Sequence, residues 1–187
     1  IGPDFLRAGI GFGGFCFPKD LEAFYWLSKK IGYDFELLKE VKKINEEQKL
    51  WMVKKVEQEL WNVEGKTVGI LGLAFKPGTD DMRFAPSIDI VNKLLELGAK
   101  IKVYDPVAMS NAKRIFGKSV YYAKDPYDCV RNCDCVCLVT EWDEFKALDF
   151  DRVKKLVNHP VLIDGRNLYD PEKMRDMGFT YISVGRP

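Results

Sequence analysis

The sequence has a single His and almost no net charge, with 29 Lys plus Arg against 28 Asp plus Glu in 187 residues, and it contains five Cys. Five cysteines without framework spacing exclude a disulfide scaffold and suit a reducing cytosol. The balanced charge excludes the basic field that sequence-independent nucleic-acid binding requires. No apolar run approaches the roughly 18 residues of a membrane span, and no signal-peptide layout is visible. We therefore expect a cytoplasmic protein that binds neither nucleic acid nor membrane.

A hydrophobic content of 47% is ample for a packed core. Period-3.6 patterns predict helices at residues 19–30, 35–60, 87–97, 110–116, 126–132, 151–157 and 171–177. Short apolar runs predict strands at residues 67–71, 100–104, 119–122, 135–139, 161–163 and 181–184. Strands that alternate with helices imply a parallel sheet. We predict an α/β fold with a Rossmann-like sheet of about six strands and helices on both faces. A helical region at 1–62, with one long connecting helix, precedes the α/β domain at 63–187.

The second helix of the predicted helical region is expected to begin after Asp34, which can cap it, and to run for 26 residues. A helix of this length spans about 39 Å, which is longer than a single small hydrophobic core. It is either a connector packed along one domain or an interdomain and dimerisation helix.

The glycine-rich run A-G-I-G-F-G-G-F-C-F-P-K-D occupies residues 8–20 and places Cys16 at the end of a loop and the start of a helix. Backbone N–H groups of a first helical turn stabilise an anion, and Lys19 adds a positive charge. The glycines allow close approach of a ligand. Cys16 is therefore a candidate nucleophile. The alternative is a small buried apolar residue on a mobile loop.

The other four cysteines, Cys129, Cys133, Cys135 and Cys137, lie within nine residues and raise the possibility of a zinc site. The spacing lacks paired C-x₂-C knuckles. Two of the four would share one face of a buried strand. We therefore predict no metal, and we expect His159 at the surface.

Three segments follow predicted strands, where parallel sheets bind ligands. The first, residues 72–83, departs from the G-x-G-x-x-G spacing of a dinucleotide site, but its Lys76 and Arg83 suit phosphates. The second contains Trp142, either a stacking surface for a base or a cover of the core. The third places Arg166 at the sheet edge, where it suits an anion.

Four ordered motifs carry a resemblance to a known family: F-G-G-F-C-F-P-K-D, G-I-L-G-L-A-F-K-P-G-T-D-D-M-R, T-E-W-D-E-F and I-D-G-R-N. The chain resembles the middle and C-terminal parts of the nucleotide-sugar dehydrogenases, closest to the UDP-glucose 6-dehydrogenase branch. The resemblance implies oxidation of a primary alcohol to a carboxylate with two NAD, through a thiohemiacetal and a thioester. It also implies an N-terminal NAD-binding domain that this chain does not match, so that the chain alone is expected not to turn over.

By resemblance, Cys16 is the covalent nucleophile and Asp20 assists hydrolysis. Lys19 and Arg83 would contact NAD. The nucleotide sugar would be held by Phe5, Arg7, Phe12, Gly13, Phe75, Lys76 and Arg166. Some of these contacts would cross the interface of a homodimer formed through the long helix.

One position departs from the family pattern: Phe15 stands where a small residue such as serine is usual. This leaves the fine specificity open. The F-P-K-D run favours UDP-glucose, but sister enzymes that oxidise GDP-mannose or a UDP-N-acetylhexosamine are alternatives. A non-catalytic nucleotide-binding and dimerisation module is another.

Overall fold

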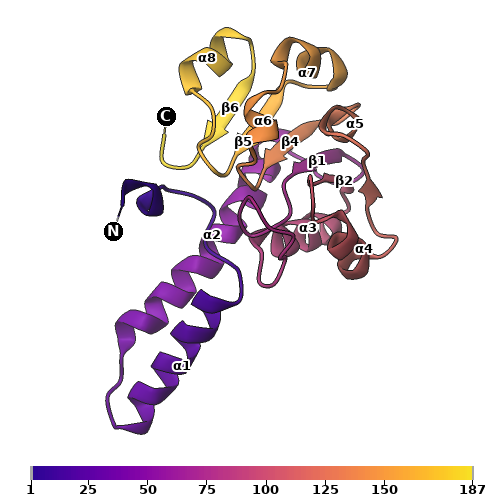
Figure 1. The fold of residues 1–187 in the computed structure, drawn as a ribbon. Coiled ribbons are helices and arrows are strands. Elements are labelled where there is room, and N and C mark those ends of the chain that lie inside the picture. The colour runs from indigo at the N-terminus through magenta and orange to yellow at the C-terminus, as the bar shows by residue number, and fades with distance from the viewer. Residues whose placement is uncertain (1, 187) are drawn as a thin grey trace.

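The computed structural model describes residues 2–186, which form a six-stranded sheet and a projecting helical hairpin (Figure 1). The strands are β1 (Thr67–Leu71), β2 (Lys100–Tyr104), β3 (Tyr121–Tyr122), β4 (Cys135–Leu138), β5 (Val161–Asp164) and β6 (Thr180–Ser183). The helices are η1 (Pro3–Leu6), α1 (Cys16–Lys30), α2 (Glu36–Leu60), α3 (Pro86–Glu96), α4 (Met109–Phe116), α5 (Pro126–Val130), α6 (Asp143–Lys146), α7 (Phe150–Leu156) and α8 (Pro171–Asp176).

All five strand pairings are parallel, and the spatial order is β3-β2-β1-β4-β5-β6. This is the order of the doubly wound dinucleotide-binding fold. The predicted Rossmann-like sheet is confirmed. The strand order reverses between β1 and β4, which is where ligands bind in such sheets, beyond the carboxyl ends of the strands.

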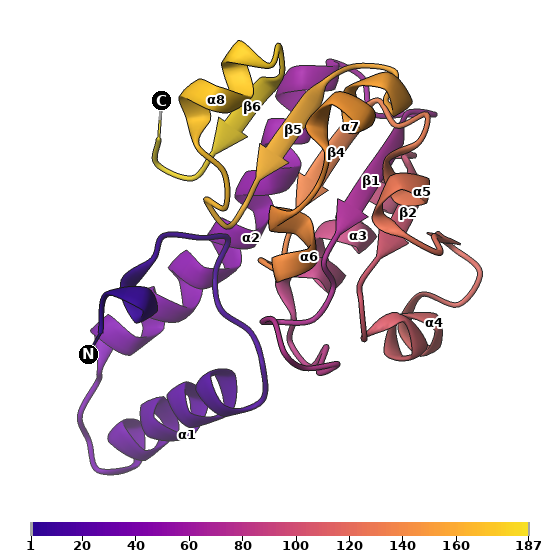
Figure 2. The same ribbon diagram turned by 45° about the horizontal axis from the view of Figure 1, so that its top comes forward.

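Each face of the sheet is covered by its own helices and its own apolar cluster. Helices α2, α3 and α4 bury residues such as Met52, Leu94 and Phe116 against one face. Helices α5, α7 and α8 bury residues such as Val130 and Val153 against the other. Figure 2 shows the sheet between these two layers. The prediction of helices on both faces is confirmed.

Helix α2 belongs to both parts of the molecule. Its C-terminal half buries Met52, Val53 and Val56 against the sheet, whereas its N-terminal half leaves the sheet and runs beside α1 (Figures 1 and 2). Its 25 residues span about 37 Å. Gly32, at φ +81°, allows the turn that ends α1.

Three local predictions need correction. Helix α1 starts at Cys16 and not at residue 19, because Pro18 fits a first turn, where no intrahelical N–H bond is lost. Asp34 does not cap α2, since the N-cap is Phe35 and has no side-chain hydrogen bond. Strand β3 has two residues, shorter than predicted for 119–122. The short helices η1 and α6 were not predicted.

The four clustered cysteines do not converge. Cys135 and Cys137 pack in the cluster beneath one face of the sheet, whereas Cys129 and Cys133 pack beneath the other. Within residues 2–186, no three Cys, His, Asp or Glu side chains gather as metal ligands would. The same described part of the chain contains no helix with the length and apolarity to cross a bilayer. His159 is exposed, as predicted.

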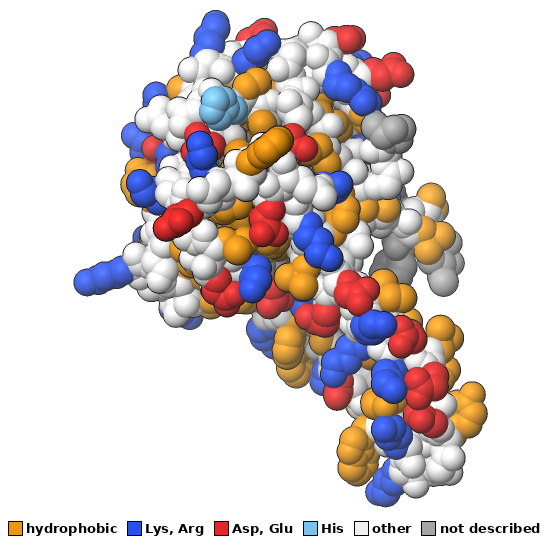
Figure 3. Space-filling view, turned by 180° about the vertical axis from the view of Figure 1, so that it is seen from behind, with side chains coloured by type: hydrophobic (Ala, Val, Ile, Leu, Met, Phe, Trp, Pro, Cys, Tyr) orange, Lys and Arg blue, Asp and Glu red, His pale blue; other side chains and the backbone are white. Residues whose placement is uncertain are grey.

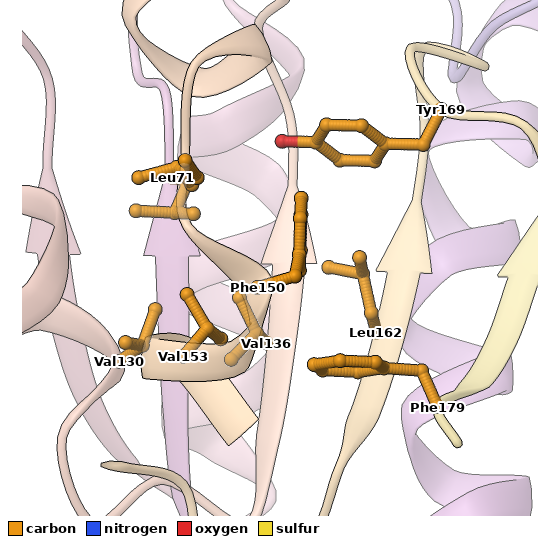
Figure 4. Close-up of a pocket in the computed structure, with 9 residues that line it drawn as sticks. Leu71, Val130, Val136, Phe150, Val153, Leu162, Tyr169 and Phe179 are labelled. Carbon is orange, nitrogen blue, oxygen red and sulfur yellow. The ribbon is translucent and has the colours of Figure 1, made fainter. Parts of the chain in front are cut away.

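A small apolar void lies in the second cluster, between β4, β5 and α7 (Figure 4). Leu71, Val136, Leu162 and Phe179 are among the residues that line it. Its volume of about 10 Å³ is at most the size of one water molecule. It is therefore a packing gap and not a ligand site.

Candidate functional site

Residues 8–15, here called the cysteine loop, cross the edge formed by the carboxyl ends of the strands. At one end, Gly9 lies beside the residues that follow β5: a Cβ on Gly9 would stand 2.9 Å from Nη1 of Arg166. Ile10 is fully buried against the same turn, where a Cβ on Gly165 would stand 2.8 Å from its side chain. At the other end, Gly13 meets the loop that follows β1, and any Cβ there would collide with the carbonyl oxygen of Phe84.

Helix α2 fixes the cysteine loop through two amide side chains. Asn45 accepts from the N–H of Phe12 at 2.7 Å and donates to the carbonyl oxygen of the same residue at 3.1 Å. Gln48 donates to the carbonyl oxygen of Gly9 at 2.9 Å. Asn45 is buried, so these bonds compete little with water. Gly11, at φ +95°, packs directly on Asn45.

The loop after β1, residues 72–85, supplies the opposite wall. The N–H of Gly14 donates to the carbonyl oxygen of Arg83 at 2.8 Å. Gly14 has φ +79°, and a Cβ there would press on the ring of Phe75 at 2.7 Å. Phe84 itself has φ +52°, an uncommon conformation for a bulky side chain. Such strain persists only where surrounding contacts over-determine it, and it clusters at functional sites.

Cys16 is the exposed cysteine, whereas the other four are buried. It is the first residue of α1, and Arg83 is close enough to interact with it electrostatically. Arg83 forms a fork with Asp81, with Nη2 2.7 Å from Oδ2. That bond lowers the pKa of Asp81 and raises the pKa of Arg83. The structure thus brings Cys16 and Arg83 together from distant parts of the chain.

The remaining candidates near the cysteine are two exposed lysines, Lys19 and Lys76, together with Asp20 and Phe12. Nζ of Lys19 lies 3.1 Å from Oδ1 of Asp20, so the two predicted neighbours of the cysteine pair with each other. Nζ of Lys76 lies 5.3 Å from the ring centre of Phe75. Phe12 is half-buried, and its ring meets that of Phe17 edge to face.

Arg166 already has a carboxylate partner. Its Nε and Nη2 donate to the two oxygens of Glu141, both at 2.6 Å, in a half-buried fork. The sequence analysis predicts that Arg166 binds an anion. It did not predict that the carboxylate of Glu141 would be its partner within the chain. Buried Asp164 shapes the turn, because it accepts from the N–H groups of Arg166, Leu168 and Tyr169 and from the hydroxyl of Tyr181.

Asp105, at the end of β2, joins three loops at the sheet edge. It is 1% exposed and accepts from the N–H groups of Leu73 and Ala74, and from those of Val107 and Ala108. The indole N–H of Trp142 donates to the same carboxylate at 3.1 Å. Trp142 packs against both apolar clusters. The geometry favours the reading of Trp142 as a cover of the core over that of a stacking surface.

Between α1 and α2 lies a groove of about 890 Å³ that reaches the cysteine loop. Phe12, Phe15 and Lys19 line it near the site, and Trp26 and Leu27 line it further out. Arg7 is exposed. The side chain of Phe5 lies outside the described residues.

Residues 9–14, G-I-G-F-G-G, have the letter spacing of a dinucleotide fingerprint but not its context. That fingerprint follows a strand and opens a helix of the same βαβ unit. In the described residues, the first strand is β1, which lies far downstream. The fold and the site therefore define a Rossmann-like α/β protein in which a separate helical segment lays a cysteine-bearing loop across the ligand-binding edge.

Comparison with known proteins agrees with this class. The model of the UDP-glucose/GDP-mannose dehydrogenase family, UDP binding domain, matches residues 69–171, and that of the family's central domain matches residues 1–47. The chain belongs to the UDP-glucose/GDP-mannose dehydrogenase family.

Among curated relatives, the UDP-glucose 6-dehydrogenase TuaD of Bacillus subtilis is 46% identical over the whole chain. A UDP-glucose 6-dehydrogenase of Pseudomonas aeruginosa is 40% identical. The chain spans 41% and 43% of the lengths of these two relatives. Among solved structures, a UDP-glucose dehydrogenase of Pyrobaculum islandicum is similar, with a TM-score of 0.84 and 36% identity. The match covers 99% of this chain and 40% of the Pyrobaculum chain.

Proposed function

We propose that this chain provides the catalytic cysteine and the UDP-binding domain of an NAD-dependent UDP-glucose 6-dehydrogenase. The observation that carries the proposal is the exposed Cys16 thiol at the first residue of α1, on a loop fixed across the sheet edge. The names of relatives at 40% and 46% identity support UDP-glucose as the substrate. Residues 1–62 act as the helical region and residues 63–187 as the nucleotide-sugar domain.

The nucleotide sugar lies along the carboxyl edge in this proposal. Lys76 meets its phosphates as a point charge, and Phe75 and Phe12 supply apolar walls. Arg166 reaches the sugar nucleotide with the nitrogen that Glu141 leaves available, Nη1, which faces Gly9. Gly13 has no side chain, so the loop backbone can lie close to the substrate. Phe5 and Arg7 would bracket the ligand from the upstream end.

Cys16 holds the reacting carbon between the two oxidations. The first oxidation converts the C6 alcohol into an aldehyde. The sulfur of Cys16 then bonds to the aldehyde carbon, and the oxygen takes up the thiol proton to give a thiohemiacetal. Loss of a hydride and the hydroxyl proton gives the thioester. The covalent bond keeps the aldehyde from escaping.

Water completes the reaction. It adds to the thioester carbonyl, the C–S bond breaks, and the sulfur regains a proton while the carboxylate leaves. Asp20 lies one turn after Cys16, on the same face of α1, and its carboxylate orients the water or a lysine supplied from outside this chain. Its Oδ1 lies 3.1 Å from Nζ of Lys19, at the surface near the helix start.

The residues beside Cys16 fit a dinucleotide. The cationic groups of Lys19 and Arg83 lie 5.4 Å and 4.6 Å from the ring centre of Phe15, at the surface, and suit a pyrophosphate. NAD, when bound, accepts one hydride in each of the two oxidations. We propose that a separate dinucleotide-binding domain holds most of the cofactor.

We also propose a homodimer through the long helix α2, because its projecting half exposes Leu37 and Ile44. Ile44→Glu should dissociate the dimer in sedimentation experiments. A wild-type protein that sediments as a monomer would overturn this part of the proposal.

The activity is tested with the protein at the full length of its relatives. UDP-glucose and NAD are supplied, and NADH formation is followed. Cys16→Ala should abolish NADH formation beyond the first turnover, with Cys133→Ala as a control whose buried thiol takes no part. Equal NADH formation by Cys16→Ala and the wild type would instead favour a non-catalytic nucleotide-binding module.

The substrate is tested by calorimetry. UDP-glucose should bind the same full-length protein more tightly than GDP-mannose or a UDP-N-acetylhexosamine. Tighter binding of either competitor would reassign the protein to a sister activity of the family.

A further inference from the structure

Phe15 immediately precedes Cys16, and its ring is 43% exposed. Two cations from different parts of the chain lie by this one ring: Cζ of Arg83 is 4.6 Å from its centre, and Nζ of Lys19 is 5.4 Å away. We propose that Phe15 is a positioning residue: it holds Arg83 and Lys19 beside the Cys16 thiol, so that the approach to the thiol favours anionic groups such as phosphates.

The backbone places Arg83 within reach of the ring. The carbonyl oxygen of Arg83 accepts from the N–H of Gly14 at 2.8 Å, so the β1 loop is joined to the residue next to Phe15. Gly13 permits this approach, because any side chain there would collide with the carbonyl oxygen of Phe84. The backbone of Arg83 is therefore fixed next to Phe15 by a loop contact, which brings its side chain over the ring.

Two groups hold the Arg83 side chain, and they differ in charge. Asp81 binds the guanidinium through Nε and Nη2, whereas the guanidinium lies over the ring of Phe15. The negative charge of Asp81 partly neutralises the positive charge of the Arg83 guanidinium. An aromatic face attracts a cation through its quadrupole and carries no net charge. Phe15 thus adds a contact to Arg83 without reducing its positive charge, and Arg83 interacts electrostatically with Cys16.

Lys19 follows the same pattern. Its ammonium group lies near the ring of Phe15 and 3.1 Å from Oδ1 of Asp20. Without the ring, two cations in this space would repel each other and turn toward solvent or their carboxylate partners. The ring therefore gathers charges that the carboxylates alone would disperse.

The test uses the 187-residue chain and measures the rate at which Cys16 is modified. Two probes are compared at low salt: a dicarboxylate aromatic disulfide, which is anionic, and neutral iodoacetamide. The four buried cysteines serve as unreactive internal controls, verified by peptide mapping. The readout is the rate of modification by the anionic probe divided by the rate with the neutral probe. A general loosening of the loop would speed both reactions and leave this ratio unchanged.

Four substitutions, used in three comparisons, test whether the aromatic ring acts through the two cations. Phe15→Leu removes the ring, and an exposed cation–ring contact predicts a fall in the ratio of about two- to five-fold. Phe15→Tyr keeps the ring and should keep the ratio. In the background Arg83→Gln with Lys19→Gln, Phe15→Leu should have no effect, because no cation remains to be held. High salt should reduce the wild-type ratio.

An unchanged ratio in Phe15→Leu would overturn the proposal, as would an equal fall in the background without the two cations. The inference rests on the proposed function only in assigning the anion to a dinucleotide or nucleotide sugar. Because no measurement here uses NADH formation, failure of the charge effect and failure of the dehydrogenase activity are told apart.

Discussion

The α/β part and the helical hairpin use their apolar side chains in opposite ways. Residues from 67 onward bury them in two clusters, one on each face of the sheet. Of the sixteen large apolar side chains that lie exposed in the described residues, twelve precede residue 62. Figure 3 shows hydrophobic side chains at the surface of the projecting helices, among the charged ones.

The contrast shows which part of the molecule supports itself. The sheet is covered on both faces, with the C-terminal half of α2 contributing to one of its two clusters, whereas the projecting hairpin leaves much of its apolar surface exposed. Exposed apolar surface of this kind marks interaction sites. The cysteine loop lies where the two parts meet, so a side chain in the hairpin, Asn45, fixes a loop that works against the sheet.

The sharpest test of the contrast compares two leucines on helices. Leu94→Ala in α3 empties a fully buried position and should lower the free energy of unfolding by about 2–5 kcal/mol. Leu37→Ala in α2, where the side chain is 66% exposed, should change it by less than about 0.5 kcal/mol. Urea unfolding followed by circular dichroism measures both under conditions where the protein is monomeric. Equal losses of unfolding free energy in the two variants would contradict the distinction between a buried sheet core and an exposed hairpin surface.

The buried thiols make the sheet sensitive to alkali. Burial raises the pKa of Cys133 to about 12 from 9.0. The folded state therefore holds this proton more tightly than the unfolded state, so the contribution is complete below pH 9 and is lost as the pH rises toward 12. Its slope should not exceed about 1.4 kcal/mol per pH unit.

Urea unfolding at a series of pH values measures this slope. Cys133→Ala should flatten the decline, and Cys16→Ala, at the exposed cysteine, should not. A stability that is constant from pH 9 to 11 would contradict the burial of these thiols.

Asp105 tests the junction of loops at the sheet edge. Asp105→Asn keeps the volume but replaces one acceptor oxygen by a donor, so buried N–H groups lose their partner. We expect a loss of about 1–3 kcal/mol in the free energy of unfolding. Asp143→Asn, at a 93% exposed side chain, should cost less than about 0.5 kcal/mol. Equal stability of the two variants would contradict the conclusion that the hydrogen bonds of Asp105 hold the loops at the sheet edge together.

Asn45 gives the smallest effect and the most local one. Asn45→Ala removes both bonds to Phe12, and the loss of about 1 kcal/mol should speed hydrogen exchange of the Phe12 amide roughly five-fold. Gln58→Ala, on the exposed face at the other end of α2, should leave that amide unchanged. Exchange that is unaffected by Asn45→Ala would mean that the loop is held by other contacts.

Much of the fold could be predicted because buried parallel strands appear as short apolar runs, as in β1 and β4, and the helices between them repeat at 3.6 residues. Strand β3 is shorter than its pattern suggests, because it lies at the sheet edge and pairs only with β2. Helix α6 is a single turn of four residues, too short for a periodic signal.

The site was predictable only where residues are close in sequence. Cys16, Lys19 and Asp20 share one motif. Asn45 was missed, since one amide in a polar-rich helix carries no sign that it faces inward. Glu141 was missed as the partner of Arg166, because the fork depends on how the turns after β4 and β5 meet at the sheet edge. A predicted role for Phe15 likewise required the position of Arg83.

The central claim is that Cys16 carries the substrate during the reaction. The most direct measurement is peptide mass mapping of the full-length protein after acid quenching during turnover of UDP-glucose with NAD. Asp20→Asn, which should slow hydrolysis, is included to raise the amount of intermediate. We predict an added UDP-glucuronyl mass on the peptide that contains Cys16, higher in Asp20→Asn. Sustained turnover by both proteins with no adduct on that peptide, together with full activity of Cys16→Ala, would contradict the account.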